Sequence, residues 1–167
     1  MKNAQLLARP GLNHRQWTAW KQEEVMASTI KTIPTRFNPA QSETIFRTLL
    51  AVEDPSDVRY YYGVLRALGH EVTVSASYAE ALTSLEHGTF DMVVVAQGSP
   101  AFEGRQVLAR AVEINPERPV LVVARTLDID CYMEAMEMGA ADYLERCAAP
   151  RDFMRSVDAR LRMKKAA

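Results

Sequence analysis

A run of four apolar residues, Met92–Val95, restricts most strongly what this chain can fold into. Its sequence, Met-Val-Val-Val, has no polar alternation, which is typical of a strand covered on both faces in a parallel sheet. The loop that follows carries Pro100 and Gly104. Ligands bind at the carboxyl ends of such strands, so the residue at this end should carry chemistry. That residue is Ala96, whose methyl group cannot donate, accept or attack.

Short strands and amphipathic helices alternate along the chain from about residue 47. Further strands are predicted at 48–52, 71–75, 119–124 and 141–144, and helices at 56–68, 77–87, 104–114, 128–138 and 150–164. The sequence Ser77-Tyr-Ala-Glu80 matches a capping box, and residues 71–75 alternate in polarity as an edge strand does. Five strands alternating with five helices predict an α/β fold, an open parallel sheet with helices on both faces.

Composition and charge exclude several classes of protein. The 167 residues include 20 Lys and Arg against 21 Asp and Glu, so no overall field favours nucleic acid or an acidic membrane surface. No apolar run approaches the roughly 20 residues of a membrane span, and the start is unlike a signal peptide. Cys131 and Cys147 lack metal-ligand spacing, so a reducing cytoplasm is expected. His14, His70 and His87 are expected to be exposed at helix ends or in loops.

The N-terminal arm, residues 1–46, differs from the regular pattern that follows it. A helix is predicted at about residues 14–30, and Pro34 and Pro39 interrupt the chain after it. Both tryptophans, Trp17 and Trp20, lie in this arm. They allow two interpretations. The arm shields an apolar patch of its own domain, or it is a docking or dimer-forming segment, because Trp is enriched at binding hot spots.

Four motifs, in order and at family spacing, resemble those of the receiver domains of response regulators (CheY-like domains). They are residues 50–59 with an acidic pair, 90–104 with Pro and Gly, 119–124, and 139–146 with an aromatic residue. The resemblance covers about residues 47–164 and implies a flavodoxin-like, five-stranded sheet for a domain at 47–167. It also implies the family's chemistry, in which a kinase supplies a phosphoryl group to an aspartate and acidic residues hold a divalent cation.

The resemblance places this phosphorylation site on residues that cannot support it. Glu53 and Asp54 match the acidic pair that binds the metal ion, and Ala96 falls on the phospho-acceptor aspartate. A methyl group cannot attack phosphorus, and it also removes one metal ligand. No cofactor is therefore expected, and Mg²⁺ binding at the acidic pair should be weak.

Other positions of the implied site also depart from the family pattern. Ala124 falls on the hydroxyl residue that couples phosphorylation to the switch aromatic, here Tyr143. Arg146 falls on the lysine and Cys147 on the proline after it, and we expect Arg146 to neutralise the acidic pair. An engineered change at position 96 would leave the other departures unexplained, which favours natural degeneration of the site.

We therefore expect a cytoplasmic, bacterial-type pseudo-receiver that is not an enzyme and that acts by binding a protein without being phosphorylated. The expected partner is a histidine kinase, a regulator or a second copy of the chain, and not nucleic acid or a membrane. The candidate binding residues lie in the arm, in the last two predicted helices and in the strand between them: Trp17, Trp20, Met133, Met136, Tyr143 and Arg155.

Two other functions stay open at this point. The chain could accept a phosphoryl group on an unconventional residue such as Ser99, or it could be a purely structural dimerisation domain. Labelling by acetyl phosphate in the presence of Mg²⁺ would support the first alternative. A concentration-independent dimer without another partner would support the second.

Overall fold

The computed structural model describes residues 45–146 and 150–166, with side chains described up to residue 161. The sheet has the strand order β2-β1-β3-β4-β5, and all four pairings are parallel. This arrangement confirms the predicted α/β fold. Its elements are β1 (Arg47–Ala51), α2 (Pro55–Ala67), β2 (Glu71–Ser75), α3 (Tyr78–His87), β3 (Met92–Ala96), α4 (Arg105–Ile114), β4 (Val120–Ala124), α5 (Ile129–Glu137), β5 (Asp142–Glu145) and α6 (Pro150–Ala166).

The predicted N-terminal helix with Trp17 and Trp20 lies outside the described residues, and so does Cys147. The boundary between residues 46 and 47 therefore stays a prediction. Among the helices that the structure does describe, none combines the length and the apolar character needed to cross a membrane.

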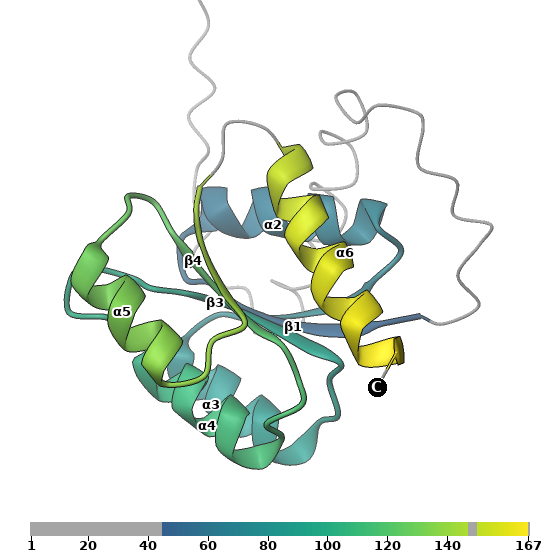
Figure 1. Ribbon diagram of the computed structural model, residues 1–167, viewed down its shortest axis with the longest axis horizontal. Helices are drawn as coiled ribbons and strands as arrows, with labels where there is room; N and C mark the ends of the chain where they lie inside the picture. The colour runs from purple at the N-terminus through teal and green to yellow at the C-terminus, as the bar shows by residue number, and fades with distance from the viewer. Residues whose placement is uncertain (1–44, 147–149, 167) are drawn as a thin grey trace, which may run out of the picture. The chain divides into compact units, whose positions relative to one another are not determined.

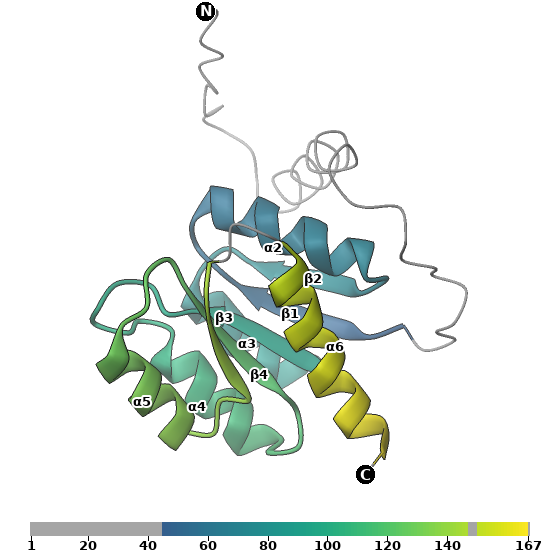
Figure 2. The same ribbon diagram turned by 45° about the horizontal axis from the view of Figure 1, so that its top comes forward.

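Helices cover both faces of the sheet. Figures 1 and 2 show α3, α4 and α5 on one face and α2 and α6 on the other. On the first face, Val93 and Val95 of β3 pack in one buried cluster with apolar residues of the three helices. All four residues of Met92–Val95 are completely buried, which explains why this strand carries no polar alternation.

Local signals in the sequence place the helix ends to within one or two residues. Asp128 caps α5 by accepting a hydrogen bond from the Cys131 N–H (3.0 Å). Ser77 caps α3 by accepting one from the Glu80 N–H (3.2 Å). The Glu80 carboxylate accepts a hydrogen bond from the N–H of Ala76 (2.7 Å), one residue before the cap. The predicted capping box therefore forms with Ala76 as the donor in place of the N–H of Ser77.

The prediction that His70 is exposed is wrong. The residue is only 3% exposed, because it precedes β2 and faces the first residues of β1. Its Nδ1 lies 2.8 Å from the Thr48 hydroxyl, and its ring lies 5.7 Å from that of Phe46. Burial lowers the pKa of His70 to about 4, against the opposing charges of Asp158 and Asp91. His87, in contrast, lies exposed at the end of α3, as predicted.

The sheet order places the ends of four strands at one edge. The order reverses between β1 and β3, and open α/β sheets bind ligands at such a reversal, beyond the carboxyl ends of the strands. Ala51 pairs with Val95, and Ala124 pairs with Glu145, so the strands stop nearly level with one another. Residues that follow β1, β3, β4 and β5 in the sequence therefore meet in space.

Candidate functional site

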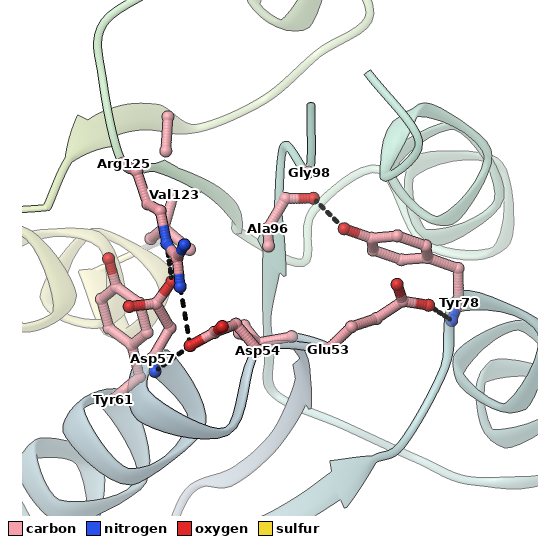
Figure 3. Close-up of a pocket in the computed structure, with 11 residues that line it drawn as sticks. Glu53, Asp54, Asp57, Tyr61, Tyr78, Ala96, Gly98, Val123 and Arg125 are labelled. Atoms are coloured by element: carbon pink, nitrogen blue, oxygen red, sulfur yellow. Dashed lines mark hydrogen bonds and ion pairs between the residues drawn. The ribbon is translucent and has the colours of Figure 1, made fainter. Parts of the chain in front are cut away.

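A pocket of about 230 Å³ lies at this edge of the sheet. Figure 3 shows its lining residues, which come from the ends of β1, β3 and β4, from the residues that follow these strands, from the first two turns of α2 and from the start of α3. The structure brings Glu53, Asp54, Ala96 and Ala124 together in this pocket, as the sequence predicted. The complete lining is Val52, Glu53, Asp54, Asp57, Tyr61, Tyr78, Ala96, Gly98, Val123, Ala124 and Arg125.

One oxygen of the Asp54 carboxylate, Oδ1, is surrounded by donors from the chain itself. It caps α2, and its Oδ1 accepts hydrogen bonds from the Ser56 N–H (2.9 Å), the Ser56 hydroxyl (2.7 Å) and the Asp57 N–H (3.2 Å). The Nη2 of Arg125 lies 2.7 Å from the same oxygen. The Ser56 hydroxyl has the largest effect, and together with Arg125 and the backbone N–H groups it holds the pKa of Asp54 well below its usual range, although burial acts in the opposite direction and more strongly than Arg125 alone.

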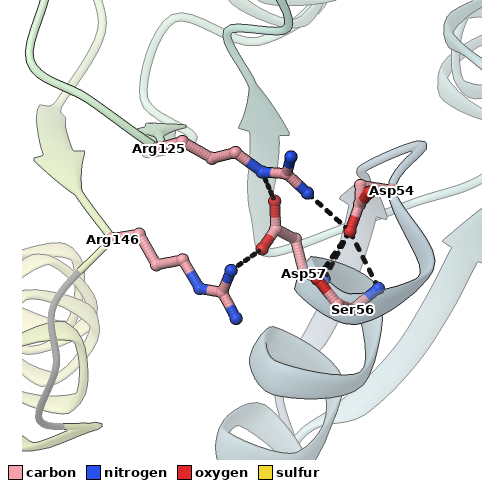
Figure 4. Close-up of polar contacts among 5 residues, drawn as sticks. All are labelled: Asp54, Ser56, Asp57, Arg125 and Arg146. Atoms are coloured by element: carbon pink, nitrogen blue, oxygen red, sulfur yellow. Dashed lines mark hydrogen bonds and ion pairs between the residues drawn. The ribbon is translucent and has the colours of Figure 1, made fainter.

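Asp57 joins two arginines from neighbouring strand ends (Figure 4). Nε of Arg125, directly after β4, donates to Oδ2 of Asp57 at 2.9 Å. Nη1 of Arg146, directly after β5, lies 2.8 Å from Oδ1, an ion pair without the alignment of a hydrogen bond. Hydrogen bonds to Asp57 first, and to Asp54, raise the pKa of Arg125 above its usual value. We refer to these four side chains, Asp54, Asp57, Arg125 and Arg146, as the ion-pair cluster.

The ion-pair cluster corrects the expected partner of Arg146 and adds Asp57 and Arg125 to the candidate site. Arg146 was expected to neutralise Glu53 or Asp54, but its carboxylate partner is Asp57. Motif comparison passed over Asp57 and Arg125 because neither falls on a position that carries the family's chemistry. A signal was nevertheless present: Arg125 is a charged residue directly after a fully buried strand, and Asp57 lies three residues after Asp54 at the start of a helix.

The opposite wall of the pocket is built around Tyr78. Its hydroxyl donates to the carbonyl oxygen of Ala96 (3.2 Å), and its backbone N–H donates to Oε1 of Glu53 (3.3 Å). Burial, and then the charges of Glu53 and Glu103, raise the pKa of the Tyr78 phenol. Glu53 thus lies across the pocket from Arg125 in Figure 3, and Tyr78 covers the end of β3.

The Tyr143 side chain is buried and forms a hydrogen bond with Gln97, a residue that the sequence analysis did not single out. It is 6% exposed, and its hydroxyl donates to Oε1 of Gln97, which directly follows Ala96 and is also buried. The amide nitrogen of Gln97 donates in turn to the carbonyl of Ser99 (3.1 Å). Tyr132 of α5 packs against Tyr143 edge to face, with ring centroids 5.7 Å apart. Tyr143 is thereby connected to both the loop after β3 and α5.

The loop after β3 is closed by Glu103 and by a glycine that contacts the strand end. The Glu103 carboxylate accepts from both the Ser99 N–H (2.6 Å) and the Ser99 hydroxyl (2.5 Å). These bonds lower the pKa of Glu103. A Cβ at Gly104 would lie 2.0 Å from the carbonyl oxygen of Ala96, so only glycine lets α4 start this close to β3.

The pocket offers a Mg²⁺ ion fewer oxygen ligands than its acidic pair suggests. Mg²⁺ requires oxygen ligands in near-octahedral geometry, usually one or two carboxylates with water. Oδ1 of Asp54 is shared by three hydrogen bonds and a guanidinium, and Ala96 supplies no side-chain oxygen. Within residues 45–146 and 150–161, no three His, Cys, Asp or Glu side chains cluster in a way that could hold a metal ion. A cation of the protein, Arg125, already neutralises Asp54.

The predicted partner-binding residues do not form one continuous set. Met133 and Met136 are exposed on α5, and Arg155 is exposed on α6, where it lies 3.6 Å from Asp152. The two helices cover opposite faces of the sheet and flank β5, in which Tyr143 is buried (Figure 1). The structure therefore presents Met133 and Met136 together, apart from Arg155.

The sequence pattern of the response regulator receiver domain matches residues 49–158 of the chain. The chain belongs to the response regulator receiver family. The match runs from within β1 into the first half of α6 and so includes all five strands. Receiver domains act in two-component signalling, where they interact with kinases and regulators.

Curated relatives share this receiver domain as part of longer proteins. The transcriptional regulatory protein ZraR of Escherichia coli K12 is 29% identical over 105 residues, which are 63% of this chain and 23% of ZraR. Protein-glutamate methylesterase/protein-glutamine glutaminase 1 of Paramagnetospirillum magneticum is 32% identical over 129 residues, 72% of this chain and 33% of that protein. The chain thus spans a third or less of the length of these relatives.

Solved structures support the receiver fold. A CheY-like receiver domain from Methanospirillum hungatei aligns with a TM-score of 0.68 at 21% identity, covering 74% of this chain and 98% of that one. A response regulator from Chloroflexus aurantiacus aligns with a TM-score of 0.65 at 25% identity, covering 71% and 99%. The first of these likenesses shows the fold alone.

Proposed function

We propose that this receiver domain signals by protein contact and without phosphorylation. The observation that carries the proposal is the position of Arg125, whose guanidinium bonds Asp54 and Asp57 in the pocket where β3 ends in Ala96. A receiver that is switched by phosphorylation needs a carboxylate nucleophile and a divalent cation there. In this chain the methyl group of Ala96 takes the place of the nucleophile, and the guanidinium of Arg125 takes the place of the divalent cation. The protein is then a binding module and not an enzyme.

The contact between Tyr143 and Gln97 supports the same proposal. An aromatic switch driven by phosphorylation has to respond to a group across the site, but Ala124 offers no hydroxyl to relay the signal. Here Gln97 accepts the Tyr143 hydrogen bond without any phosphoryl group. The surface that flanks β5 is therefore held in one state, ready for a protein partner such as a kinase or a regulator. The cytoplasmic location stays a prediction from the sequence.

Amide NMR of the 167-residue chain, titrated with Mg²⁺ and then with beryllofluoride, tests the proposal. We expect the resonances of Asp54, Ala96 and Arg146 to keep their positions, because Arg125 pairs with Asp54 and no carboxylate lies at position 96. Shifts at these residues that extend to Tyr143 would show a working phosphoryl switch and refute the proposal. Beryllofluoride mimics the acyl phosphate.

A reconstructed site provides the positive control for this titration. The variant carrying Ala96→Asp, Ala124→Thr, Arg125→Ala and Arg146→Lys restores the nucleophile, the hydroxyl and the lysine and removes the competing cation. We expect it to bind Mg²⁺ and to respond to beryllofluoride. The single variant Ala96→Asp should respond far less, because Arg125 still neutralises Asp54.

Ser99 is the acceptor in the competing proposal of unconventional phosphorylation. Its hydroxyl is exposed and donates to Glu103, whose negative charge would repel an incoming phosphoryl donor. Incubation with labelled acetyl phosphate and Mg²⁺ distinguishes the two proposals. Incorporation that is lost in Ser99→Ala would favour Ser99 as the acceptor. A dimer that does not depend on concentration and binds no other protein would favour the purely structural role.

The Tyr143–Gln97 contact also has a measurable effect on stability. Because both side chains are buried, Tyr143→Phe should lower the free energy of unfolding by about 1–2 kcal/mol by leaving Oε1 of Gln97 without its donor. The double variant Tyr143→Phe/Gln97→Leu should lose less than the sum of the two single changes. The matched control is Tyr132→Phe, an exposed tyrosine on α5, which should cost nearly nothing. Urea denaturation monitored by circular dichroism measures the four variants: Tyr143→Phe, Gln97→Leu, the double variant and Tyr132→Phe.

A further inference from the structure

Exposed apolar side chains gather on and just before α5. Seven large hydrophobic residues are exposed in the described part of the chain, and five of them lie between residues 127 and 136. Single exposed apolar residues are common on protein surfaces, whereas a contiguous group of them indicates an interaction site. We refer to these five residues as the α5 patch: Leu127, Ile129, Tyr132, Met133 and Met136.

The sequence around the α5 patch carries negative charge alone. Residues 126–145 contain six Asp and Glu and no Lys, Arg or His. Arg105 of α4 pairs with Glu134 at 2.8 Å, and Arg160 of α6 lies 3.5 Å from Asp142. Two of the six negative charges are therefore neutralised by arginines of other helices. Within the described residues no ion pair is found for Asp130 or Glu137, which lie on α5 beside the patch.

This charge pattern selects among the possible occupants of the patch. A second copy that docked by two-fold symmetry would place the same acidic residues against each other, and like charges across an interface oppose binding. An amphipathic helix whose apolar stripe is flanked by Lys or Arg matches both the apolar and the acidic parts of the surface. Methionine side chains adapt to such a stripe because they are flexible and polarisable, and Met133 and Met136 are two of the five residues of the α5 patch.

The patch is also connected to the buried interior at one point. Tyr132 packs edge to face on Tyr143, and Tyr143 is bonded to Gln97. Cys131 and Ala135 face inward on the same helix and anchor it in the core. The exposed side chains of α5 are thus presented on a helix that the interior holds in place.

We propose that the α5 patch binds a basic amphipathic helix of a partner protein. The proposal rests on the proposed function, in which this domain acts by protein contact. The partner helix lays an apolar stripe on Ile129, Met133 and Met136 while its Lys or Arg side chains meet Asp130 and Glu137.

A synthetic peptide tests this proposal directly. The probe is a fluorescein-labelled 18-residue peptide of Leu and Lys, patterned as an amphipathic helix, and its matched comparison has Glu in place of every Lys. We expect fluorescence anisotropy with the 167-residue chain in 150 mM salt to show binding of the Leu/Lys peptide. The Leu/Glu peptide should bind at least about tenfold more weakly, and raised salt should weaken the Leu/Lys complex.

Variants locate the binding surface. Ile129→Ser/Met133→Ser should weaken the Leu/Lys peptide by at least about tenfold, and Asp130→Asn/Glu137→Gln should weaken it and reduce its salt dependence. The matched control is Ile114→Ser, an exposed apolar residue at the end of α4, which should leave binding unchanged. Because all these side chains are exposed, the fold should survive each change.

Other outcomes overturn the proposal. Equal binding of the Leu/Glu peptide would show that charge does not select the partner, and an equal loss in Ile114→Ser would show unspecific binding. A concentration-dependent dimer in sedimentation that Ile129→Ser/Met133→Ser abolishes would show that a second copy occupies the patch. If the Leu/Lys peptide does not bind and beryllofluoride shifts no resonance, the proposal for the α5 patch is wrong but the phosphorylation-independent function is still supported. If the peptide binds only in the presence of beryllofluoride, the phosphorylation-independent function is wrong, but the α5 patch is still the binding site for a basic helix.

Discussion

Between pH 6.5 and about pH 4 the domain should lose about 3 kcal/mol of its free energy of unfolding through His70 alone. In this range the unfolded chain binds a proton at the imidazole while the folded domain excludes it, because burial keeps the folded pKa near 4. The unfolded state then holds more protons, so stability falls as the pH falls. From about one pH unit above 6.5 the imidazole is neutral in both states and contributes no pH dependence.

Chemical denaturation at half-unit steps between pH 4 and pH 8 measures this loss. His70→Gln should flatten the curve between pH 6.5 and pH 4, because glutamine can still contact the Thr48 hydroxyl but does not titrate. The matched control is His87→Gln, an exposed histidine at the end of α3, which should retain the full slope. Circular dichroism is the suitable signal, because both tryptophans lie in residues 1–46. An unchanged slope in His70→Gln would show that carboxylates cause the loss instead.

Removing Asp57 should be the most damaging single change in the ion-pair cluster. We expect Asp57→Ala to lower the free energy of unfolding by about 2–3 kcal/mol, because it leaves two arginines beside each other without their shared carboxylate. The Asp57 side chain is 10% exposed, whereas those of Arg125 and Arg146 are 57% and 38% exposed, so water screens part of the repulsion.

A double-variant cycle separates the pairing from the other roles of Asp57. Asp57→Ala/Arg125→Ala should cost less than the sum of the two single variants, since the second change removes a cation that the first leaves unpaired. The control is Asp152→Ala, whose contact with Arg155 at 3.6 Å is fully at the surface and should contribute less than about 0.5 kcal/mol. Urea denaturation at pH 7 gives these values. A loss in Asp57→Ala no larger than in the control would mean that the cluster contributes nothing to stability.

The sequence was sufficient for the fold because its elements are set by local patterns. The unbroken apolar run at Met92–Val95 required a strand buried on both faces, and the Ser77 and Asp128 caps fixed where two helices begin. It was also sufficient to bring Glu53, Asp54, Ala96 and Ala124 to one pocket, since parallel strands end at a common edge.

The polar partners within the site could not be predicted in the same way. Which carboxylate Arg146 would contact depends on the reach and rotamer of a long side chain, and the structure selects Asp57. Arg125 and Gln97 follow strand ends, but nothing in their local sequence reveals that one bridges Asp54 and Asp57 and the other receives the Tyr143 hydroxyl. His70 was misjudged because a histidine after a glycine reads as a turn residue, whereas here it faces β1 across the start of β2.

The positive charges in this site belong to two arginine side chains, Arg125 and Arg146, and this has a consequence for regulation. A metal ion can be removed by a chelator and a phosphoryl group by a phosphatase, but Arg125 and Arg146 are part of the chain and cannot be removed in this way. Under the proposed function, such a receiver keeps no phosphoryl group as a record of an earlier signal, and no rate of dephosphorylation limits how long its signal lasts. Under the same proposal, the output of the domain follows its concentration and the concentrations of its partners.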